Sequence, residues 1–151
     1  MKIFKKFLLL TLALMLSAFC FSAIACTPTP TDVTGKTYVF SEMEMHGGGM
    51  DVSIKAGDNF MGTVLDKDYM SFTFNADGTV VAIVEGESMD GTWSQNGKTV
   101  TITIQDEPQD FTATGNTLTM SGTEIDPDMG TINMTVVLKE YVEETTSSSS
   151  I

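Results

Sequence analysis

Apolar and polar residues alternate with a period of two along most of the second half of the chain, and this pattern predicts β-strands. The clearest run is Thr99–Ile104, where valine or isoleucine alternates with threonine. A second regularity lies within Tyr69–Ser121, where a short pattern occurs in three copies. In each copy, a glycine follows an aromatic residue at the fourth position after it. These copies begin at Phe74, Trp93 and Phe111, which lie 19 and 18 residues apart. That spacing is the length of a β-hairpin with its turns.

Eight strands are expected in total, the first over Gly35–Met45 and the last over Ile132–Leu138. Each is apolar on one face and mostly threonine or serine on the other. Sequential hairpins with short turns favour closure of the sheet, which predicts an all-β, eight-stranded antiparallel up-and-down barrel. The interior of such a barrel is either filled by its own side chains or holds one small ligand. The pattern leaves both interiors open.

Two segments interrupt the alternation. Residues 50–67 have a partial helical spacing of apolar residues, which predicts one short helix or lid after the first strand, with an irregular crossover loop as the alternative. Thr123–Gly130 is acidic and reads as a loop. Because the rest of the chain is regular scaffold, we expect ligand specificity to lie in Met43–Lys67 and in Thr123–Gly130.

The N-terminus has the features of an export signal. Three lysines precede the apolar stretch Phe7–Phe21, and small residues follow it, which predicts a signal peptide over residues 1–25. The sequence Ala23–Cys26 resembles the bacterial lipobox, which implies cleavage before Cys26 and lipidation of its thiol. An ordinary secreted protein with one stray thiol is the alternative. Lipidation at Cys26 predicts an extracytoplasmic protein held on the cell membrane or the outer envelope surface.

The remaining organisation follows from composition. Residues 26–33 are the lipidated cysteine and a threonine–proline tether, residues 34–141 the barrel domain, and residues 142–151 a polar tail that we expect to be disordered. Beyond residue 25 the chain contains a single cysteine, so an internal disulfide is excluded and the core must supply the stability. We expect a monomer.

Charge restricts the partners. All 20 acidic residues, but only five of the eight basic ones, lie beyond residue 25, so this part of the chain has a net charge of −15. Phosphate backbones would be repelled, which excludes nucleic acid as a partner.

Three hairpin phrases, Phe74–Thr79, Asp90–Trp93 and Gly115–Thr119, resemble the lipocalin-like domains of bacterial surface lipoproteins, which are calycin-type barrels. Gly35–Tyr38 lies where such domains begin their first strand. The resemblance extends over about Thr34–Glu140 and implies a binding or accessory role in the envelope, without naming a ligand.

A hollow barrel would bind a small hydrophobic ligand through its inward apolar side chains, and ordinary core packing is the alternative for each of them. The predicted lining residues are Phe40, Phe72, Phe74, Trp93, Ile102, Phe111, Met120 and Met134. A filled barrel would instead serve as a structural or interaction module of the envelope, presenting an acidic surface to a partner.

Few residues suggest other chemistry. Thioethers and one imidazole lie close in sequence at Met43, Met45, His46 and Met50, a combination that suits copper(I), but core methionines and a loop histidine are the favoured explanation. The chain has one histidine, and the predicted strands bring no nucleophile and base together. We therefore expect neither an enzyme nor a bound cofactor.

Overall fold

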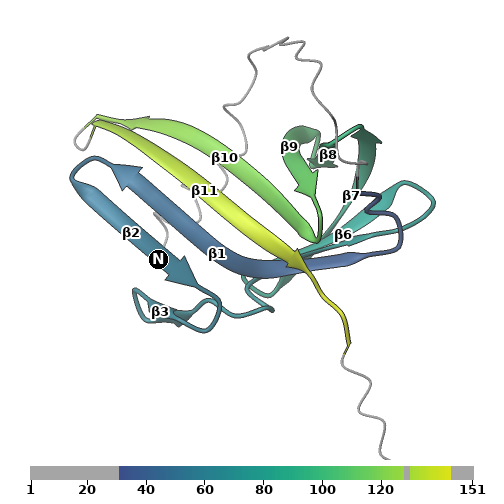
Figure 1. Ribbon diagram of the computed structural model, residues 1–151, viewed down its shortest axis with the longest axis horizontal. Helices are drawn as coiled ribbons and strands as arrows, with labels where there is room; N and C mark the ends of the chain where they lie inside the picture. Colours follow the sequence, from purple (N-terminus) through teal and green to yellow (C-terminus); the bar gives the residue numbers. More distant parts are fainter. Residues whose placement is uncertain (1–30, 128–129, 144–151) are drawn as a thin grey trace, which may run out of the picture.

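The computed structural model describes residues 31–127 and 130–143 (Figure 1). The predicted signal peptide over residues 1–25, Cys26 and most of the polar tail lie outside the described residues. Within the described part there are strands and no helix. The strands are β1 (Thr37–Gly47), β2 (Met50–Lys55), β3 (Asn59–Phe60), β4 (Thr63–Val64), β5 (Met70–Phe74), β6 (Thr79–Val84), β7 (Glu87–Asn96), β8 (Thr99–Ile104), β9 (Glu107–Thr114), β10 (Thr117–Asp126) and β11 (Gly130–Glu140).

Eight of these strands form the predicted closed antiparallel barrel. From β5 to β11 each strand pairs with the next, and β1 closes the circle by pairing with β11 on one side and β5 on the other. Turn residues make these tight hairpins possible: in the β5–β6 turn, the Asp77 carboxylate accepts hydrogen bonds from the Thr79 amide at 3.0 Å and hydroxyl at 2.6 Å. These bonds stabilise the ionised carboxylate and hold the Asp77 pKa below its usual value.

Strand β1 is long because it serves two neighbours in turn. Its first residues, Thr37–Val39, pair with β5. The register then shifts between Phe40 and Glu42, and the rest of the strand pairs with β2. Such a β-bulge bends a strand and re-aims it. As a result, β2, β1, β11 and β10 form a long sheet that projects away from the other barrel strands (Figure 1).

In the barrel, the pairing between β9 and β10 is short. These strands share only three residue pairs, ending at Thr119 and Thr112, although both continue beyond this point. Figure 1 shows them leaving a common corner in different directions. We call the unpaired parts, Glu107–Phe111 of β9 and Met120–Asp126 of β10, the β9–β10 split.

The prediction of a short helix within residues 50–67 is wrong. This segment forms β2 and the small β3–β4 hairpin. Gly57 and Gly62 adopt positive φ of 95° and 89°, which a helix cannot contain. The Gly57 amide donates to the Leu65 carbonyl at 2.8 Å, and the Leu65 side chain, 1% exposed, packs into the core.

The acidic segment Thr123–Gly130 also differs from its predicted loop. Strand β10 runs on to Asp126 and pairs with β11, with Glu124 opposite Ile132. Here β-structure comes from the partner strand rather than from local propensity, since the segment contains few β-branched residues.

Candidate ligand-binding interior

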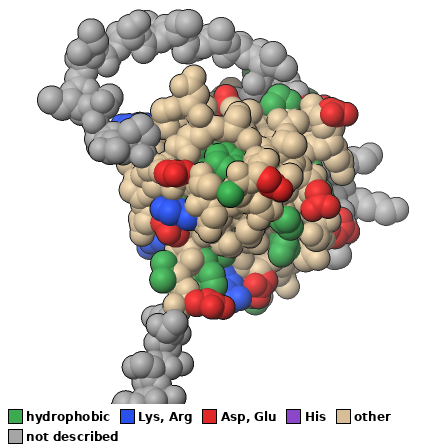
Figure 2. All heavy atoms as spheres, turned by 90° about the vertical axis from the view of Figure 1, so that its right-hand side faces the viewer, with side chains coloured by type: hydrophobic (Ala, Val, Ile, Leu, Met, Phe, Trp, Pro, Cys, Tyr) green, Lys and Arg blue, Asp and Glu red, His purple; other side chains and the backbone are tan. Residues whose placement is uncertain are grey.

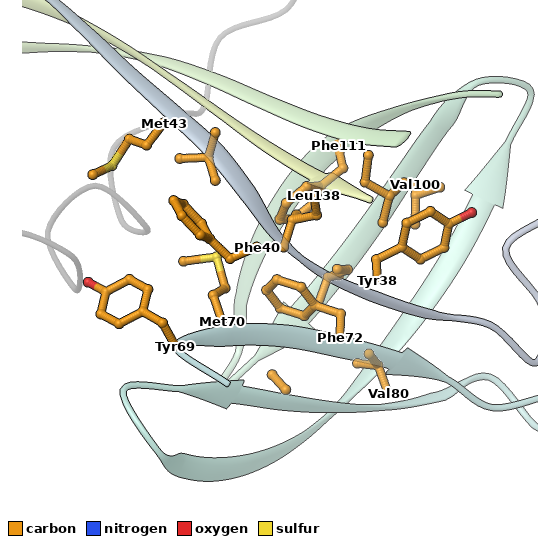
Figure 3. Close-up of a cluster of buried hydrophobic side chains, with 14 of the residues drawn as sticks. Tyr38, Phe40, Met43, Tyr69, Met70, Phe72, Val80, Val100, Phe111 and Leu138 are labelled. Carbon is orange, nitrogen blue, oxygen red and sulfur yellow. The ribbon is translucent and has the colours of Figure 1, made fainter. Parts of the chain in front are cut away.

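The inward side chains form one apolar core. Period-two alternation places all eight predicted lining residues on the inner face, and all of them belong to or pack against the same cluster. Phe40, Phe72, Phe74, Ile102 and Phe111 are buried, whereas Trp93, Met120 and Met134 are only partly buried. Figure 3 shows aromatic and aliphatic side chains from opposite strands pointing toward one another.

One end of the barrel is closed by aromatic rings. Tyr38 and Trp93 each meet Phe74 edge-to-face, with ring centroids 5.9 and 5.3 Å apart respectively. The Trp93 indole nitrogen donates to the Asn75 carbonyl at 3.0 Å, which fixes the ring at the barrel wall. Such contacts add to the energy of burial.

The chain preceding β1 seals this end further. Val33 is fully buried, and its amide donates to the Gln95 side-chain oxygen at 3.3 Å. The Gln95 amide nitrogen in turn donates to the Thr31 carbonyl at 2.6 Å. Lys36 and Glu140 form an ion pair at 3.1 Å beside these residues. The side-chain oxygen and nitrogen of Gln95 are therefore both used in hydrogen bonds within the chain.

The opposite end is less completely packed. Phe40 meets Tyr69 edge-to-face at 5.9 Å, and Leu65 from the β4–β5 connection covers part of the core. Met89, Met120 and Met134 also face inward, but they remain partly exposed. The β9–β10 split lies at this end, because the pairing of β9 with β10 is lost there. Apolar surface thus stays accessible on the inner side of the split.

Three polar atoms are buried without a hydrogen-bond partner among the described residues: the Tyr38 hydroxyl, the Gln109 side-chain oxygen and one Glu124 carboxylate oxygen. Tyr38 is fully buried, and burial, followed by the charge of Glu140, raises its pKa to about 12. Burial also raises the pKa of Tyr69 to about 12, with the charge of Glu85 and a weak hydrogen bond to it contributing.

Gln109 and Glu124 lie on the two strands of the split. Gln109 is 7% exposed and occupies an inward position of β9, level with Ile102 on β8. Glu124 is on the inner face of β10, and burial, followed by the charge of Asp126, raises the pKa of its carboxyl. Glu124 was expected in a loop, and neither Glu124 nor Gln109 was predicted to line the interior. The alternation of Gln109 with Phe111 and Ala113 is the signal that could have found it.

The three copper candidates whose side chains the structure describes do not converge. Met43 and Met45 point into the core and are 7% and 8% exposed. His46 follows on the other face of β1, where its Nδ1 lies 2.8 Å from Asp51 and its Nε2 lies 3.8 Å from Glu44. The Met50 side chain is outside the described part. Among the described residues, no group of three or more histidine, cysteine or acidic side chains could hold a metal ion.

On the face seen in Figure 2, scattered hydrophobic, acidic and lysine side chains lie among polar uncharged side chains and backbone. Exposed threonines and serines of β7, β8 and β9 face outward along these strands. No helix of residues 31–127 and 130–143 has the length and hydrophobicity needed to cross a membrane.

Comparison with known proteins identifies the domain. No curated protein and no solved structure matches the chain significantly. The family model described as a lipocalin-like domain matches residues 35–120, more than half of the 151 residues. This region runs from the first barrel strand to Met120 at the beginning of the split. The closed eight-stranded barrel with its apolar inner face agrees with the match, and the chain belongs to the lipocalin-like domain family.

Proposed function

We propose that the barrel binds a small hydrophobic ligand against the inward side chains at the β9–β10 split. The observation that carries this function is the partial exposure of Met89, Met120 and Met134, which pack against a largely buried apolar core. Removing such apolar surface from water stabilises a complex by roughly 25 cal/mol per Å². Methionine side chains are flexible and polarisable, so they adapt to ligands of different shape. Membership of the lipocalin-like family supports the same function.

Binding can be measured with the chain beginning at Thr27, because all strands and buried core residues of the described part lie within residues 33–140. N-phenyl-1-naphthylamine, an apolar dye that fluoresces on leaving water, is titrated while the emission of Trp93 is followed. Trp93 is the single tryptophan and packs against the core, so energy transfer to the dye reports binding in the barrel. We expect a saturable signal with one site per chain.

A matched pair of variants tests the location. Met120→Glu places a charge on the inner face of β10, whereas Ser121→Glu adds the same charge one residue later, on the exposed outer face. We expect the first to weaken dye binding at least tenfold, because a ligand would have to desolvate the carboxylate, and the second to leave it unchanged. The absence of a saturable signal in the unmodified chain would overturn the function and leave a filled barrel that acts as a structural or interaction module.

We also propose that the domain is lipid-anchored at Cys26 and extracytoplasmic, on the cell membrane or the outer envelope surface. The support is the lipobox-like Ala23–Cys26 after a basic and apolar N-terminus. The tether that follows Cys26 is short, so the barrel would stay close to the lipid surface, where hydrophobic ligands are concentrated.

Cell fractionation tests the anchor. The unmodified full chain is expected in the membrane fraction and Cys26→Ser in the soluble fraction, with Cys20→Ser as the control that keeps the anchor. Equal fractionation of the Cys26→Ser variant and the unmodified chain would refute lipidation at this residue.

A further inference from the structure

Strand β10 has a free edge along most of its length. It pairs with β11 throughout but with β9 only as far as Thr119, so one edge of Met120–Ile125 has no strand beside it among the described residues. Figure 1 shows β10 at the border of the projecting sheet, with β11 on one side of it. A free edge presents a row of amide and carbonyl groups with which another extended chain can pair. Met120–Ile125 is as long as a typical strand, so it can bind a strand-length segment.

Two other strand edges in the described part are protected against such pairing. Strand β9, on the other side of the split, contains Pro108, which has no amide hydrogen to donate. Strand β2 pairs only with β1 and ends at Lys55, whose amide already donates to the Asp58 carboxylate at 2.8 Å. Proline and lysine are residues that commonly prevent edge strands from pairing. Strand β10 contains neither, so its edge is the one open to a partner.

Two side chains of β10 lack the neighbour that an additional strand would supply. Ile125 is 78% exposed on the outer face, and no other large apolar side chain of the barrel strands in the described part is exposed. On the opposite face, one carboxylate oxygen of Glu124 is buried and has no hydrogen-bond partner among the described residues. Side chains on neighbouring strands stabilise a sheet in pairs, and buried polar groups are nearly always hydrogen-bonded. An added strand can satisfy both residues.

The charge at this edge indicates the kind of partner. Strand β10 and the residues Gly130–Leu138 paired with it contain no lysine, arginine or histidine. Burial, followed by the charge of Asp126, raises the pKa of the Glu124 carboxyl, because no cation offsets these two effects. A basic side chain beside Glu124 would form a charge-assisted hydrogen bond with it. A second copy of this acidic chain is a poor partner, because its own β10 would bring more carboxylates to the edge.

We propose that the free edge of β10 binds an extended, basic segment of another polypeptide. The segment adds to the sheet as a strand, with a lysine or arginine beside Glu124 and an apolar side chain beside Ile125. Backbone hydrogen bonds supply the affinity, and the acidic inner face of β10 selects the partner by charge. This interaction goes beyond the hydrophobic-ligand function and does not depend on it.

Three fluorescein-labelled peptides of eight residues test the proposal with the chain beginning at Thr27. The first alternates valine and threonine around one central lysine, the second has glutamate in place of the lysine, and the third is the lysine peptide with N-methylated backbone amides. Fluorescence anisotropy measures their binding. We expect the lysine peptide to bind saturably and the glutamate peptide at least about tenfold more weakly, because repulsion replaces a charge-assisted hydrogen bond. The N-methylated peptide should not bind, because it cannot donate backbone hydrogen bonds.

Variants and amide hydrogen exchange locate the binding site. We expect amides of Met120–Ile125 to exchange more slowly in the complex and those of β2 to be unaffected. Glu124→Gln should abolish the preference for lysine over glutamate, and Glu124→Lys should reverse it. Glu44→Lys, the same change of charge on the outer face of β1, is the control and should leave the preference unchanged.

The outcomes distinguish this proposal from the hydrophobic-ligand function. Lack of saturable binding of the lysine peptide, equal binding of the glutamate or N-methylated peptide, or a preference that survives Glu124→Gln would overturn strand addition at β10. Concentration-dependent dimerisation of the free chain, with protection of the same amides, would assign the edge to a second copy and also overturn it. The dye titration is measured separately on the same chain, so its failure would overturn the hydrophobic-ligand function alone.

Discussion

At the scale of single residues, the most unusual feature is a buried hydroxyl group without a partner. Tyr38 is fully buried between the aromatic rings of the closed end, and its hydroxyl accepts and donates no hydrogen bond among the described residues (Figure 3). Its ring packs edge-to-face on Phe74 and so stabilises the fold. The unsatisfied hydroxyl lowers the stability of the fold. An unsatisfied buried hydroxyl costs about 1–3 kcal/mol.

Tyr38→Phe is therefore expected to leave the free energy of unfolding unchanged or to raise it by about 1 kcal/mol, because the ring stays and the orphan group is removed. Urea unfolding followed by Trp93 fluorescence measures this change. Tyr69→Phe is the comparison, since the Tyr69 hydroxyl has a weak partner in Glu85 at 3.5 Å. A destabilisation of Tyr38→Phe by more than about 1 kcal/mol would mean that the hydroxyl has a partner in solution.

At the scale of elements, close packing between β7 and β8 depends on the absence of a side chain at Gly91. A Cβ at this position would collide with the Thr103 carbonyl and lie 2.9 Å from the Ile104 side chain. Gly91 pairs directly with Ile104, so neither strand can move without breaking the ladder. We expect Gly91→Ala to lower the free energy of unfolding by about 1–3 kcal/mol, the usual effect of overpacking.

Gly35→Ala is the matched control for Gly91→Ala, measured by the same urea unfolding. Gly35 has a positive φ of 71° but nothing within 4 Å of the added Cβ, so its replacement strains only the backbone. Gly91 is not among the positive-φ residues, so its replacement reports steric overlap alone. If Gly91→Ala were as stable as the unmodified chain, β7 and β8 would be more adaptable than their pairing indicates.

The sequence predicted elements well where a strand carries its own alternation. Runs such as Thr99–Ile104 identify both the strand and its inward face, which is why the lining residues fall on the core. The helix prediction for residues 50–67 failed because apolar residues of two separate hairpins fall at helical spacing. The end of β10 was missed because its inward positions hold acidic residues, and only pairing with β11 makes it a strand.

The same reasoning explains which part of the candidate site could be predicted. Apolar lining residues follow from periodicity, whereas Gln109 was hidden by its neighbour Pro108, which reads as a turn. Proline is tolerated there because one edge of β9 is unpaired along the split. Which polar groups lack partners depends on where pairing between strands ends, and that is a property of the closed barrel rather than of any one segment.

At the scale of the whole molecule, the two buried tyrosines make the barrel sensitive to alkali. Tyr38 lies at the closed end and Tyr69 at the opposite end, and the pKa of each is raised to about 12 from the ordinary value of 10. Their neutral forms are favoured in the folded state, so the stabilisation is fully present below pH 10. It is lost as the pH rises from 10 through 12, because the unfolded chain releases these protons first.

The free energy of unfolding is accordingly expected to fall by a few kcal/mol between pH 9 and pH 12, with about 1.4 kcal/mol per pH unit from each tyrosine as the upper limit. Urea unfolding at pH 9, 10 and 11 measures the fall, and tyrosinate absorbance at 295 nm gives the pKa values directly. Lys67 acts in the same direction, because its hydrogen bond and ion pair with Asp68 raise the Lys67 pKa.

The Tyr38→Phe, Tyr69→Phe double variant separates the tyrosines from this lysine and from general charge repulsion. If the buried hydroxyl groups cause the fall, the double variant keeps most of its stability up to pH 11, and each single variant loses about half as much as the unmodified chain. An identical fall in the double variant would place the alkaline sensitivity in the excess negative charge of the chain. The stability of the core would then not depend on tyrosine ionisation, and the packing around Tyr38 and Tyr69 would have to open to water before the main unfolding transition.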